Sequence, residues 1–545
     1  MRALVVLLIA TLFLPVQTGA GTHLAGSVLG ANGDPLPMAH VHLLSYRGDI
    51  RKPLRTVAAD REGRFALVVD EPGMYRLLFT GVDHDKVSVP LLLVSEAPEI
   101  RLSVRLAPLA YKEHFEVVRI VGDWNGFTWE AADTMRAQPD GTFLYERTVT
   151  GDTIAYQLFD ITKEARTVNG TSADYYAYDG GGDYVSVLRV RDGRARIVFA
   201  PSKLLRVSPE GLPAVDFLSG GRALQAIWAI DDLLRKEQQA FQAAAAAYSQ
   251  SHQDMRDFHY DWSPTVARLK QWMGPEQELL VRQFAGLRIT WLVPFRARID
   301  STTQAEIAEL LPPSSPIWGL EPQAALVAHR DPQQQELFAH ALVAENPDHT
   351  VRAVALAFLA SMAQLKGDSA ALAARYALLQ QEYNDVPEVQ YYLKSLNPAR
   401  RIARGKAVPD FAVQLMDGGQ TLTNKDLLGK YYLLDFWATW CGPCIGEMPH
   451  LHAAYERCKD KNFAILSLSL DRRPEDVTAF REKRWPMPWL HAFLTGGFQN
   501  ELVQSFEVLG IPRPILVGPS GTIVEVEERL RGAGLLTTHA KYLGP

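Results

Sequence analysis

The stretch FWATWCGPCIGEMP, which runs from Phe436 to Pro449, contains two of the three cysteines of this 545-residue chain. The apolar run YYLLDFW at 431–437 overlaps its start and predicts a buried strand, whereas the apolar spacing from about 444 to 459 predicts a helix. Cys441 and Cys444 therefore lie where a strand passes into a helix.

The position of these cysteines predicts their chemistry. Unpaired N–H groups and the dipole at the start of a helix favour negative charge, which lowers a cysteine pKa from about 8.5 toward neutrality. We expect Cys441 to be the nucleophilic thiolate, and Cys444, one turn further in, to resolve a mixed disulfide by attacking its sulfur. Gly442 and Pro443 form the tight turn, where proline is tolerated because the first helical N–H groups have no partner.

Two other interpretations of a C-x-x-C pair fit this sequence less well. Half of a zinc site needs two more ligands at metal spacing, but Cys458 stands alone and His450 and His452 lie on the same following helix. No metal is therefore expected. A purely structural disulfide here would close a very short loop and gain little chain-entropy stabilisation.

The segment around the motif alternates strand and helix patterns. Predicted strands at 463–470, in PILVG and in TIVEV accompany predicted helices in PEDVTAFREKR and QNELVQSFEV. The predicted fold of residues 401–545 is therefore an α/β sheet with helices on its faces.

Several motifs of this segment together carry a family resemblance. DFWATWCGPC, from Asp435 to Cys444, resembles the thioredoxin active-site signature, and the following IGEMP resembles the TlpA/ResA-like branch of exported thiol:disulfide oxidoreductases. VPDF at 408–411 and LGIPRPILVGPSGTI at 509–523 resemble the start and the cis-proline segment of that branch. The resemblance implies a thioredoxin-like domain whose redox-active group is a disulfide between Cys441 and Cys444, with no other cofactor.

The resemblance also implies roles for residues around the dithiol. Pro512 would form a cis peptide bond, which is uncommon and needs a structural reason. Ile511 before it would then pair through its backbone with an extended substrate segment. Trp440, Gly442 and Pro443 would belong to the same substrate-binding surface.

Three charged residues complete the predicted site. Asp435 matches the buried acid that handles the proton of the inner cysteine in thioredoxins, and Glu447 matches the acid that the ResA-like group uses near its cysteines. Each has a structural alternative, as a hydrogen-bonded acid at a strand end or as a charge interacting with the helix dipole. Arg513 stands where the family commonly has small hydroxylated or apolar residues, and would add positive charge beside the site.

The first residues, MRALVVLLIATLFLPVQTGAG, have the pattern of an export signal. Arg2 supplies the positive charge, Ala3 to Pro15 the short apolar stretch, and Thr18 to Ala20 the small-residue cleavage site. We expect residues 1–20 to be a signal peptide and the bacterial periplasm to be the destination; an uncleaved membrane anchor is the alternative. In an oxidising compartment three cysteines cannot build a disulfide framework, which favours a chemical role for them.

Composition and length limit the expected partners and the expected number of domains. The formal net charge of −6, with no basic block, gives no reason to expect nucleic acid as a partner. At roughly 150 residues per domain, the length predicts three or four domains.

Two β-rich regions lie upstream. Residues 21–106 alternate short β-patterned runs with turns, which predicts a β-sandwich, and GSVLGANGDPLPMAHVHLL resembles transthyretin-like domains related to the carboxypeptidase regulatory domain. In residues 107–205, VRIVGDWNGFTWEAADTMRAQPDGTFLYERTV resembles immunoglobulin-like E-set domains associated with glycogen and starch enzymes. Docking of a glycan or a protein by these domains stays open, since Trp124 and Trp129 could stack on sugars or pack internally.

Residues 206–400 are assigned to an α-helical domain. Near Ser219 the apolar period changes from two to about 3.6, and amphipathic segments follow one another up to the SLNPAR exit. Small residues at the predicted helix contacts favour a solenoid-like packing.

The sequence thus predicts a multidomain exported thiol:disulfide oxidoreductase that reduces protein disulfides through Cys441 and Cys444. The family implies a membrane electron donor. One alternative is a binding or scaffold protein with a redox-sensing thioredoxin-like domain. The other is a peroxiredoxin-like peroxidase, which would need a lone peroxidatic cysteine after a Thr/Ser-containing loop rather than this pair.

Overall fold

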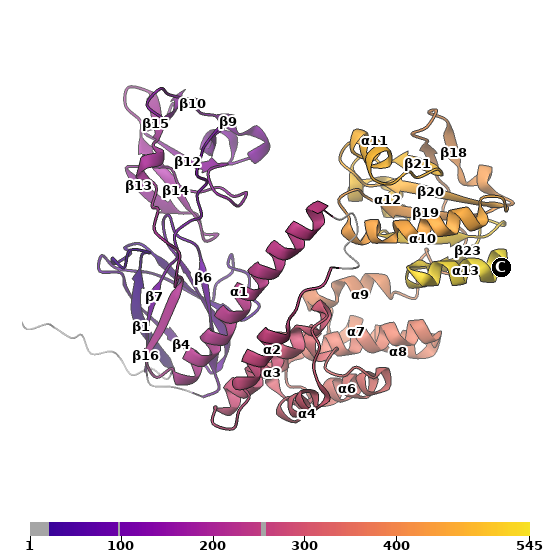
Figure 1. Cartoon of the computed structure of the whole chain (residues 1–545), viewed down its shortest axis with the longest axis horizontal. Helices are drawn as coiled ribbons and strands as arrows, with labels where there is room; N and C mark the ends of the chain where they lie inside the picture. Colours follow the sequence, from indigo (N-terminus) through magenta and orange to yellow (C-terminus); the bar gives the residue numbers. More distant parts are fainter. Residues whose placement is uncertain (1–20, 96–98, 252–257, 545) are drawn as a thin grey trace, which may run out of the picture. The chain divides into compact units, whose positions relative to one another are not determined.

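The computed structural model describes residues 21–95, 99–251 and 258–544 (Figure 1). The predicted signal peptide lies outside the described residues. Within them, no helix combines the length and the apolar character that crossing a membrane requires. The chain divides into two compact units, one made of 1–234 with 271–285 and the other of 235–270 with 286–545.

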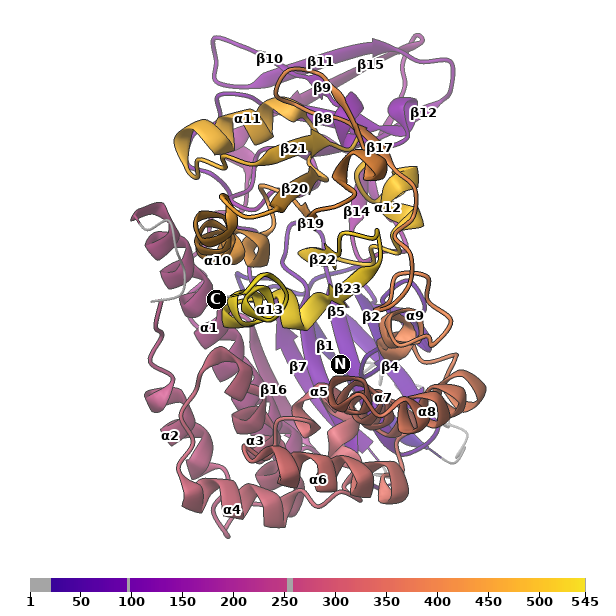
Figure 2. The same cartoon turned by 90° about the vertical axis from the view of Figure 1, so that its right-hand side faces the viewer.

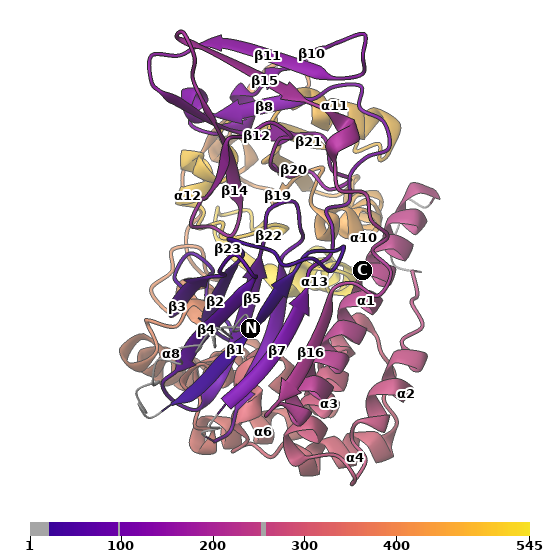
Figure 3. The same cartoon turned by 90° about the vertical axis from the view of Figure 1, so that its left-hand side faces the viewer.

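The first unit begins with two four-stranded sheets (Figure 3). One sheet has the order β16-β7-β1-β4, with β1 (Thr22–Leu29), β4 (Arg64–Val69), β7 (Glu99–Arg105) and β16 (Ala214–Ser219). The other has the order β3-β2-β5-β6, with β2 (His40–Ser45), β3 (Arg55–Ala58), β5 (Gly73–Thr80) and β6 (Val87–Leu93). Phe65 and Phe79, one from each sheet, pack edge to face with ring centroids 5.6 Å apart, so apolar faces of the two sheets meet.

Strand β16 lies in the range that the sequence analysis assigned to the helical domain. It pairs antiparallel with β7, where Val215 stands opposite Val104. The short alternating run that forms β16 has no strand close to it in the sequence with which to pair. Its place in a sheet depends on β7, which lies more than 100 residues earlier. Helix α1 (Arg222–Ser251) follows directly, in agreement with the change of period near Ser219.

Two further sheets follow in the first unit. One has the order β13-β14-β12-β8-β9, with β8 (Arg119–Gly122), β9 (Asp133–Thr134), β12 (Thr153–Phe159), β13 (Tyr175–Tyr178) and β14 (Tyr184–Arg189). The other has the order β10-β11-β15, with β10 (Arg136–Ala137), β11 (Phe143–Thr148) and β15 (Arg194–Phe199). Buried side chains from both sheets, including Ile120, Tyr156 and Ile197, form one core.

The aromatic residues of this region mainly contact one another. The ring of Trp124 stacks on Tyr145 at 5.3 Å, and its indole N–H donates to Asp133 at 2.9 Å. Trp129 is half exposed, yet one face of its ring stacks on Phe159 at 5.6 Å. Packing therefore covers one face of each of these two indole rings.

Several of the helical segments begin at aspartate caps. The helices are α1, α2 (Ser263–Gln271), α3 (Leu279–Trp291), α4 (Ser301–Leu310), α5 (Pro322–Ala325), α6 (Pro332–Glu345), α7 (His349–Lys366), α8 (Ser369–Glu382) and α9 (Gln390–Ser395). Helices α1 to α3 contribute residues to both units. An aspartate carboxylate accepts an N–H of the first turn in four of them, at Asp300, Asp331, Asp348 and Asp368. In α7, Ala353, Ala357 and Ala360 are fully buried, which lets neighbouring helices approach closely.

The C-terminal part of the second unit is built on a five-stranded sheet. Its order is β21-β20-β19-β22-β23, with β19 (Tyr431–Trp437), β20 (Phe463–Ser469), β21 (Leu490–Phe493), β22 (Arg513–Val517) and β23 (Ile523–Val526). Strands β19, β20 and β21 are parallel, whereas β22 is antiparallel to β19 and to β23. The small hairpin of β17 (Ala412–Gln414) and β18 (Thr421–Thr423) precedes the sheet.

Strand β19 sends alternate side chains to the two faces of this sheet. Leu434 and Phe436 join the core that includes residues of α12 (Glu501–Ser505). Leu433 and Trp437 join the core that contains residues of α10 (Gly442–Cys458), α11 (Pro474–Lys483) and α13 (Ala533–Leu543). Figure 2 shows α10 and α13 packed together beside the sheet.

Candidate active site

The two cysteines of the motif form a disulfide at the start of α10. Their sulfurs are 2.03 Å apart and their Cα atoms 5.2 Å apart. Strand β19 ends at Trp437, and Cys441 is the N-cap residue of α10, whose first turn contains Gly442, Pro443 and Cys444. The buried strand thus fixes the point at which the helix begins, and the cap position presents the outer sulfur.

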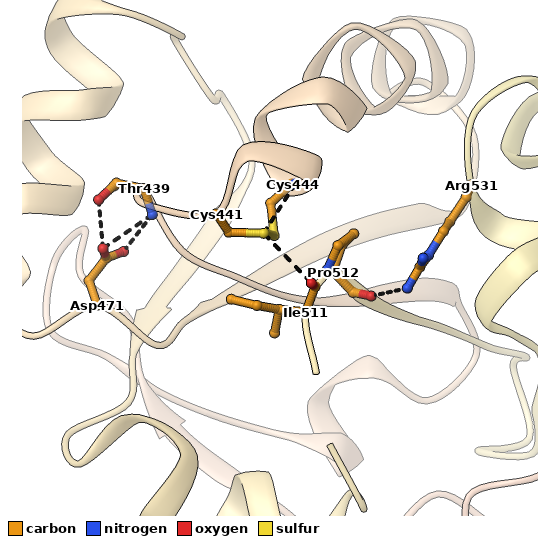
Figure 4. Close-up of a disulfide and its surroundings, with 7 residues drawn as sticks. All are labelled: Thr439, Cys441, Cys444, Asp471, Ile511, Pro512 and Arg531. Atoms are coloured by element: carbon orange, nitrogen blue, oxygen red, sulfur yellow. Dashed lines mark hydrogen bonds between the residues drawn. A yellow bond between two sulfur atoms is a disulfide. The ribbon is translucent and has the colours of Figure 1, made fainter. Parts of the chain in front are cut away.

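The surroundings of the two sulfurs differ (Figure 4). The backbone N–H of Cys444 donates to the Sγ of Cys441 at 3.1 Å, and this Sγ lies 3.7 Å from the carbonyl oxygen of Ile511. Cys441 is 5% exposed and Cys444 is 1% exposed, whereas Trp440 before them is 58% exposed. The outer sulfur therefore lies at the rim of the exposed surface formed by Trp440, Gly442 and Pro443.

The Ile511–Pro512 peptide bond is cis and lies opposite the disulfide. The guanidinium of Arg531 donates to the Pro512 carbonyl oxygen, and Figure 4 shows it reaching the proline from the side away from Thr439. Ile511 precedes β22, so its backbone is outside the sheet ladder. The structure thus brings Cys441, Cys444, Ile511 and Pro512 together.

An unpredicted carboxylate holds the loop between β19 and the first cysteine. Asp471 accepts the N–H of Thr439 at 3.1 Å and its hydroxyl at 2.6 Å, and it also accepts the hydroxyl of Ser469 at 2.8 Å. Asp471 lies two residues after the end of β20, which runs parallel to β19. Because the carboxyl ends of parallel strands meet at one edge of the sheet, this acid could have been found from the sequence.

Asp435 lies on the same sheet face as the disulfide. Leu433, two positions before it, and Trp437, two positions after it, point to the same face of β19. Both pack in one core with Cys441 and Cys444. Its carboxyl group is buried and accepts the hydroxyl of Ser467 at 3.1 Å. Burial raises the pKa of Asp435 to about 7, and the negative charge of Glu447 adds to the effect, although the Ser467 hydrogen bond opposes it. This carboxyl group can therefore gain or lose a proton near neutral pH.

Glu447 lies on α10, within two helical turns of Cys441 and Cys444. Its carboxylate accepts the backbone N–H of Gly532 at 2.7 Å, which connects α10 to the segment before α13. The side chain is half buried. Its negative charge contributes to the raised pKa of Asp435.

The sequence analysis expected Arg513 to add positive charge beside the site, and in the structure this side chain is buried. The residue is 5% exposed, and its guanidinium forms an ion pair with Glu527. As the first residue of β22 it stands opposite Phe436 of β19, so its side chain lies on the face opposite α10. The glutamate partner lies 14 residues further on, after β23, where no local pattern announces it.

Cys458 lies at the far end of α10. It is buried, and its Sγ is 3.8 Å from the Nδ1 of His539. Burial raises the pKa of its thiol, which makes it less reactive at neutral pH. In residues 21–95, 99–251 and 258–544, no cluster of three or more metal-ligating side chains is present.

Comparisons with known proteins agree on the C-terminal region. A family model described as the AhpC/TSA family matches residues 404–526. The thiol-disulfide oxidoreductase ResA of Bacillus thuringiensis subsp. konkukian is 31% identical over 121 residues, which is 22% of this chain and 67% of that protein. The ResA of Oceanobacillus iheyensis is 31% identical over 145 residues, 26% of this chain and 70% of that protein.

The chain belongs to the ResA family of thiol-disulfide oxidoreductases. We call residues 401–545 the ResA-like domain. Among solved structures, the thioredoxin domain of a thiol-disulfide oxidoreductase from Bacteroides vulgatus is 35% identical, covers 26% of this chain and 98% of that one, and has a TM-score of 0.24. A thiol:disulfide interchange protein from Bacteroides sp. is 34% identical, covers 27% and 93%, and also has a TM-score of 0.24. By its identity to the ResA proteins, the ResA-like domain is a thioredoxin-like oxidoreductase, and the remainder of the chain lies outside the matched region.

Proposed function

We propose that this protein reduces disulfide bonds in proteins outside the cytoplasm, with Cys441 as nucleophile and Cys444 as resolving thiol. The observation that carries the proposal is the bonded Cys441–Cys444 pair at the helix start, with its outer sulfur next to Ile511. The N–H of Cys444 is already directed at this sulfur, so a thiolate formed there gains a hydrogen bond without rearrangement.

The reaction has two exchange steps. The Cys441 thiolate attacks one sulfur of the substrate disulfide, forms a mixed disulfide and releases the other substrate sulfur as a thiolate. Cys444 then gives up its proton, attacks the Sγ of Cys441 and releases the second substrate thiol. Two electrons pass to the substrate, and the enzyme is left with the disulfide seen in the structure.

Asp435 supports the second step as the proton acceptor for Cys444. Its carboxyl group lies on the same face as Cys444, and its pKa of about 7 suits transfer near neutral pH. Glu447 tunes this group through its charge. Ile511 and the exposed Trp440 would form the surface on which a substrate segment lies.

The wider arrangement extends the proposal. Residues 1–20 would direct export, a membrane dithiol protein would return electrons to Cys441 and Cys444, and the upstream sheets would form transthyretin-like and immunoglobulin-like sandwiches that dock a protein. The solenoid-like helical segment would join them to the ResA-like domain.

The test uses the full chain with insulin as disulfide substrate and dithiothreitol as electron source. Wild-type protein should accelerate insulin reduction, Cys441→Ala should abolish the acceleration, and Cys458→Ala, which alters the buried thiol, should retain it. Cys444→Ser should accumulate mixed disulfides that mass spectrometry identifies. Equal rates for wild type and Cys441→Ala would refute the proposal.

A further inference from the structure

A small cavity of about 120 Å³ lies next to the cis-proline segment. Its lining includes Ile511, whose carbonyl oxygen is 3.7 Å from the Sγ of Cys441. Any chain bonded to Cys441 and lying along Ile511 therefore passes close to this cavity. The volume equals roughly four water molecules, which is also enough for a carboxylate and one or two methylene groups.

The cavity is lined by charged side chains of both signs. Arg513, Arg531, Glu507 and Glu527 all line it. Arg400 contacts both glutamates, with its Nε 3.3 Å from Glu507 and its Nη1 3.2 Å from Glu527. Arg400 and Arg513 therefore share the carboxylate of Glu527, and Arg400 also contacts Glu507.

Arg513 is the side chain with unused donors. It is 5% exposed and its guanidinium is paired with Glu527, yet its Nε and Nη2 have no hydrogen-bond partner among the described residues. Buried donors without acceptors cost free energy, and the guanidinium fork matches the two oxygens of a carboxylate. Burial, together with the neighbouring Arg400, lowers the pKa of Arg513 to about 9, so the guanidinium remains charged at neutral pH.

Resting on the proposed function, we propose that this cavity is a specificity subsite for the carboxylate of an aspartate or glutamate near the reacting cysteine of a peptide disulfide. The acidic side chain enters beside Ile511 and accepts hydrogen bonds from Arg513 while the neighbouring cysteine reacts with Cys441. The subsite favours substrates with an acidic residue within two positions of their cysteine.

The experiment compares pairs of disulfide peptides that differ only in having a side-chain carboxylate or a carboxamide. Glutamate or glutamine is placed at each of the two positions on either side of the cysteine, and each peptide is mixed with pre-reduced full-length protein in single turnover. At one or more positions glutamate should react roughly tenfold faster than glutamine, because a hydrogen bond to a charged group is replaced by a neutral one.

Variants assign the preference to the cavity. In Arg513→Gln the ratio of the glutamate rate to the glutamine rate should fall to about one, while Arg513→Lys, which keeps the charge and loses the fork, should keep part of it. Arg472→Gln makes the same charge change on an exposed side chain outside the cavity, and its ratio should equal that of wild type. Glu527→Gln removes a competing carboxylate and should raise the ratio, which provides a second test if Arg513→Gln does not fold.

The outcomes separate this subsite from the proposed function. If wild-type protein reduces both peptides of every pair at equal rates, the oxidoreductase function stands and the subsite is refuted. An unchanged ratio in folded Arg513→Gln, or in Glu527→Gln, also refutes it and leaves the arginines as a structural ion network. If neither peptide is reduced, the proposed function fails and the subsite falls with it.

Discussion

The backbone N–H of Cys444 donates a hydrogen bond to the Sγ of Cys441 at 3.1 Å. Because this donor and the helix start favour a thiolate, Cys441 of the reduced protein should react with iodoacetamide at pH 7 at least about tenfold faster than Cys458, whose thiol pKa is raised by burial. Mass spectrometry of the labelled peptides measures both rates in one sample. Equal labelling of the two cysteines would contradict the expected activation.

Asp435 should give the second exchange step a pH dependence near neutrality. The carboxylate accepts a proton only when it is ionised, so the rate should rise as the pH increases through about 7 and level off above it. Asp435→Asn should lower the rate at pH 8 by roughly 100-fold, the contribution typical of a general base, and flatten the profile. Stopped-flow measurement of mixed-disulfide resolution checks this, and a normal profile in the variant would assign the proton to another group.

Raising the pH through the pKa of Asp435 should increase the rate of the second exchange step but decrease the stability of the folded protein. The pKa of Asp435 is raised in the folded protein, so the folded state holds a proton that the unfolded state loses between about pH 4 and pH 7. The free energy of unfolding should therefore fall as the pH rises through this window, by an amount on the order of 4 kcal/mol. Urea unfolding of the oxidised protein and of Asp435→Asn at pH 4.5 and pH 8 should show the variant gaining relative stability at the higher pH.

Glu447→Gln should shift the pH profile of resolution toward lower pH. The negative charge of Glu447 disfavours ionisation of Asp435, so its removal lowers the pKa of that carboxyl group. The glutamine can still accept the N–H of Gly532, which keeps the contact between α10 and the segment before α13. An unshifted midpoint would mean that the charge of Glu447 does not affect the ionisation of Asp435.

Asp471 should position the loop that precedes the nucleophile. Its carboxylate accepts two hydrogen bonds from Thr439, and Asp471→Asn should cost about 2 to 3 kcal/mol of unfolding free energy, because charged acceptors make the stronger bonds. Asp476→Asn is the matched control, since Asp476 forms an ion pair with an exposed arginine that contributes less than about 1 kcal/mol. Similar losses of unfolding free energy in both variants would contradict the positioning role of Asp471.

Local sequence patterns predicted much of the ResA-like domain. The apolar run at 431–437 coincides with β19, and the helix expected from about 444 begins at Gly442, because the proline of the motif is compatible with a first helical turn. Alternation along β19 places Asp435 with the cysteines, and this could be inferred once the strand was assigned.

Long-range pairing could not be predicted in the same way. Strand β16 belongs with β7, and Arg513 is paired with Glu527 and lies close to Arg400, contacts that depend on how distant segments meet. The sequence predicted positive charge beside the site at Arg513 but not its ion pair, because a single arginine carries no sign of its partner. Residues that precede and follow the sheet in the sequence bury the Arg513 guanidinium, and this burial determines its pKa and its partners.

The 70-residue separation between Cys441 and Ile511 has a consequence for biosynthesis. During translation the motif leaves the ribosome well before β22 exists, and the pair is then an ordinary dithiol on an incomplete sheet. Only when β22 docks against β19 does the carbonyl of Ile511 reach the outer sulfur. The surface that presents the outer sulfur to another protein is therefore complete only once β22 has paired with β19.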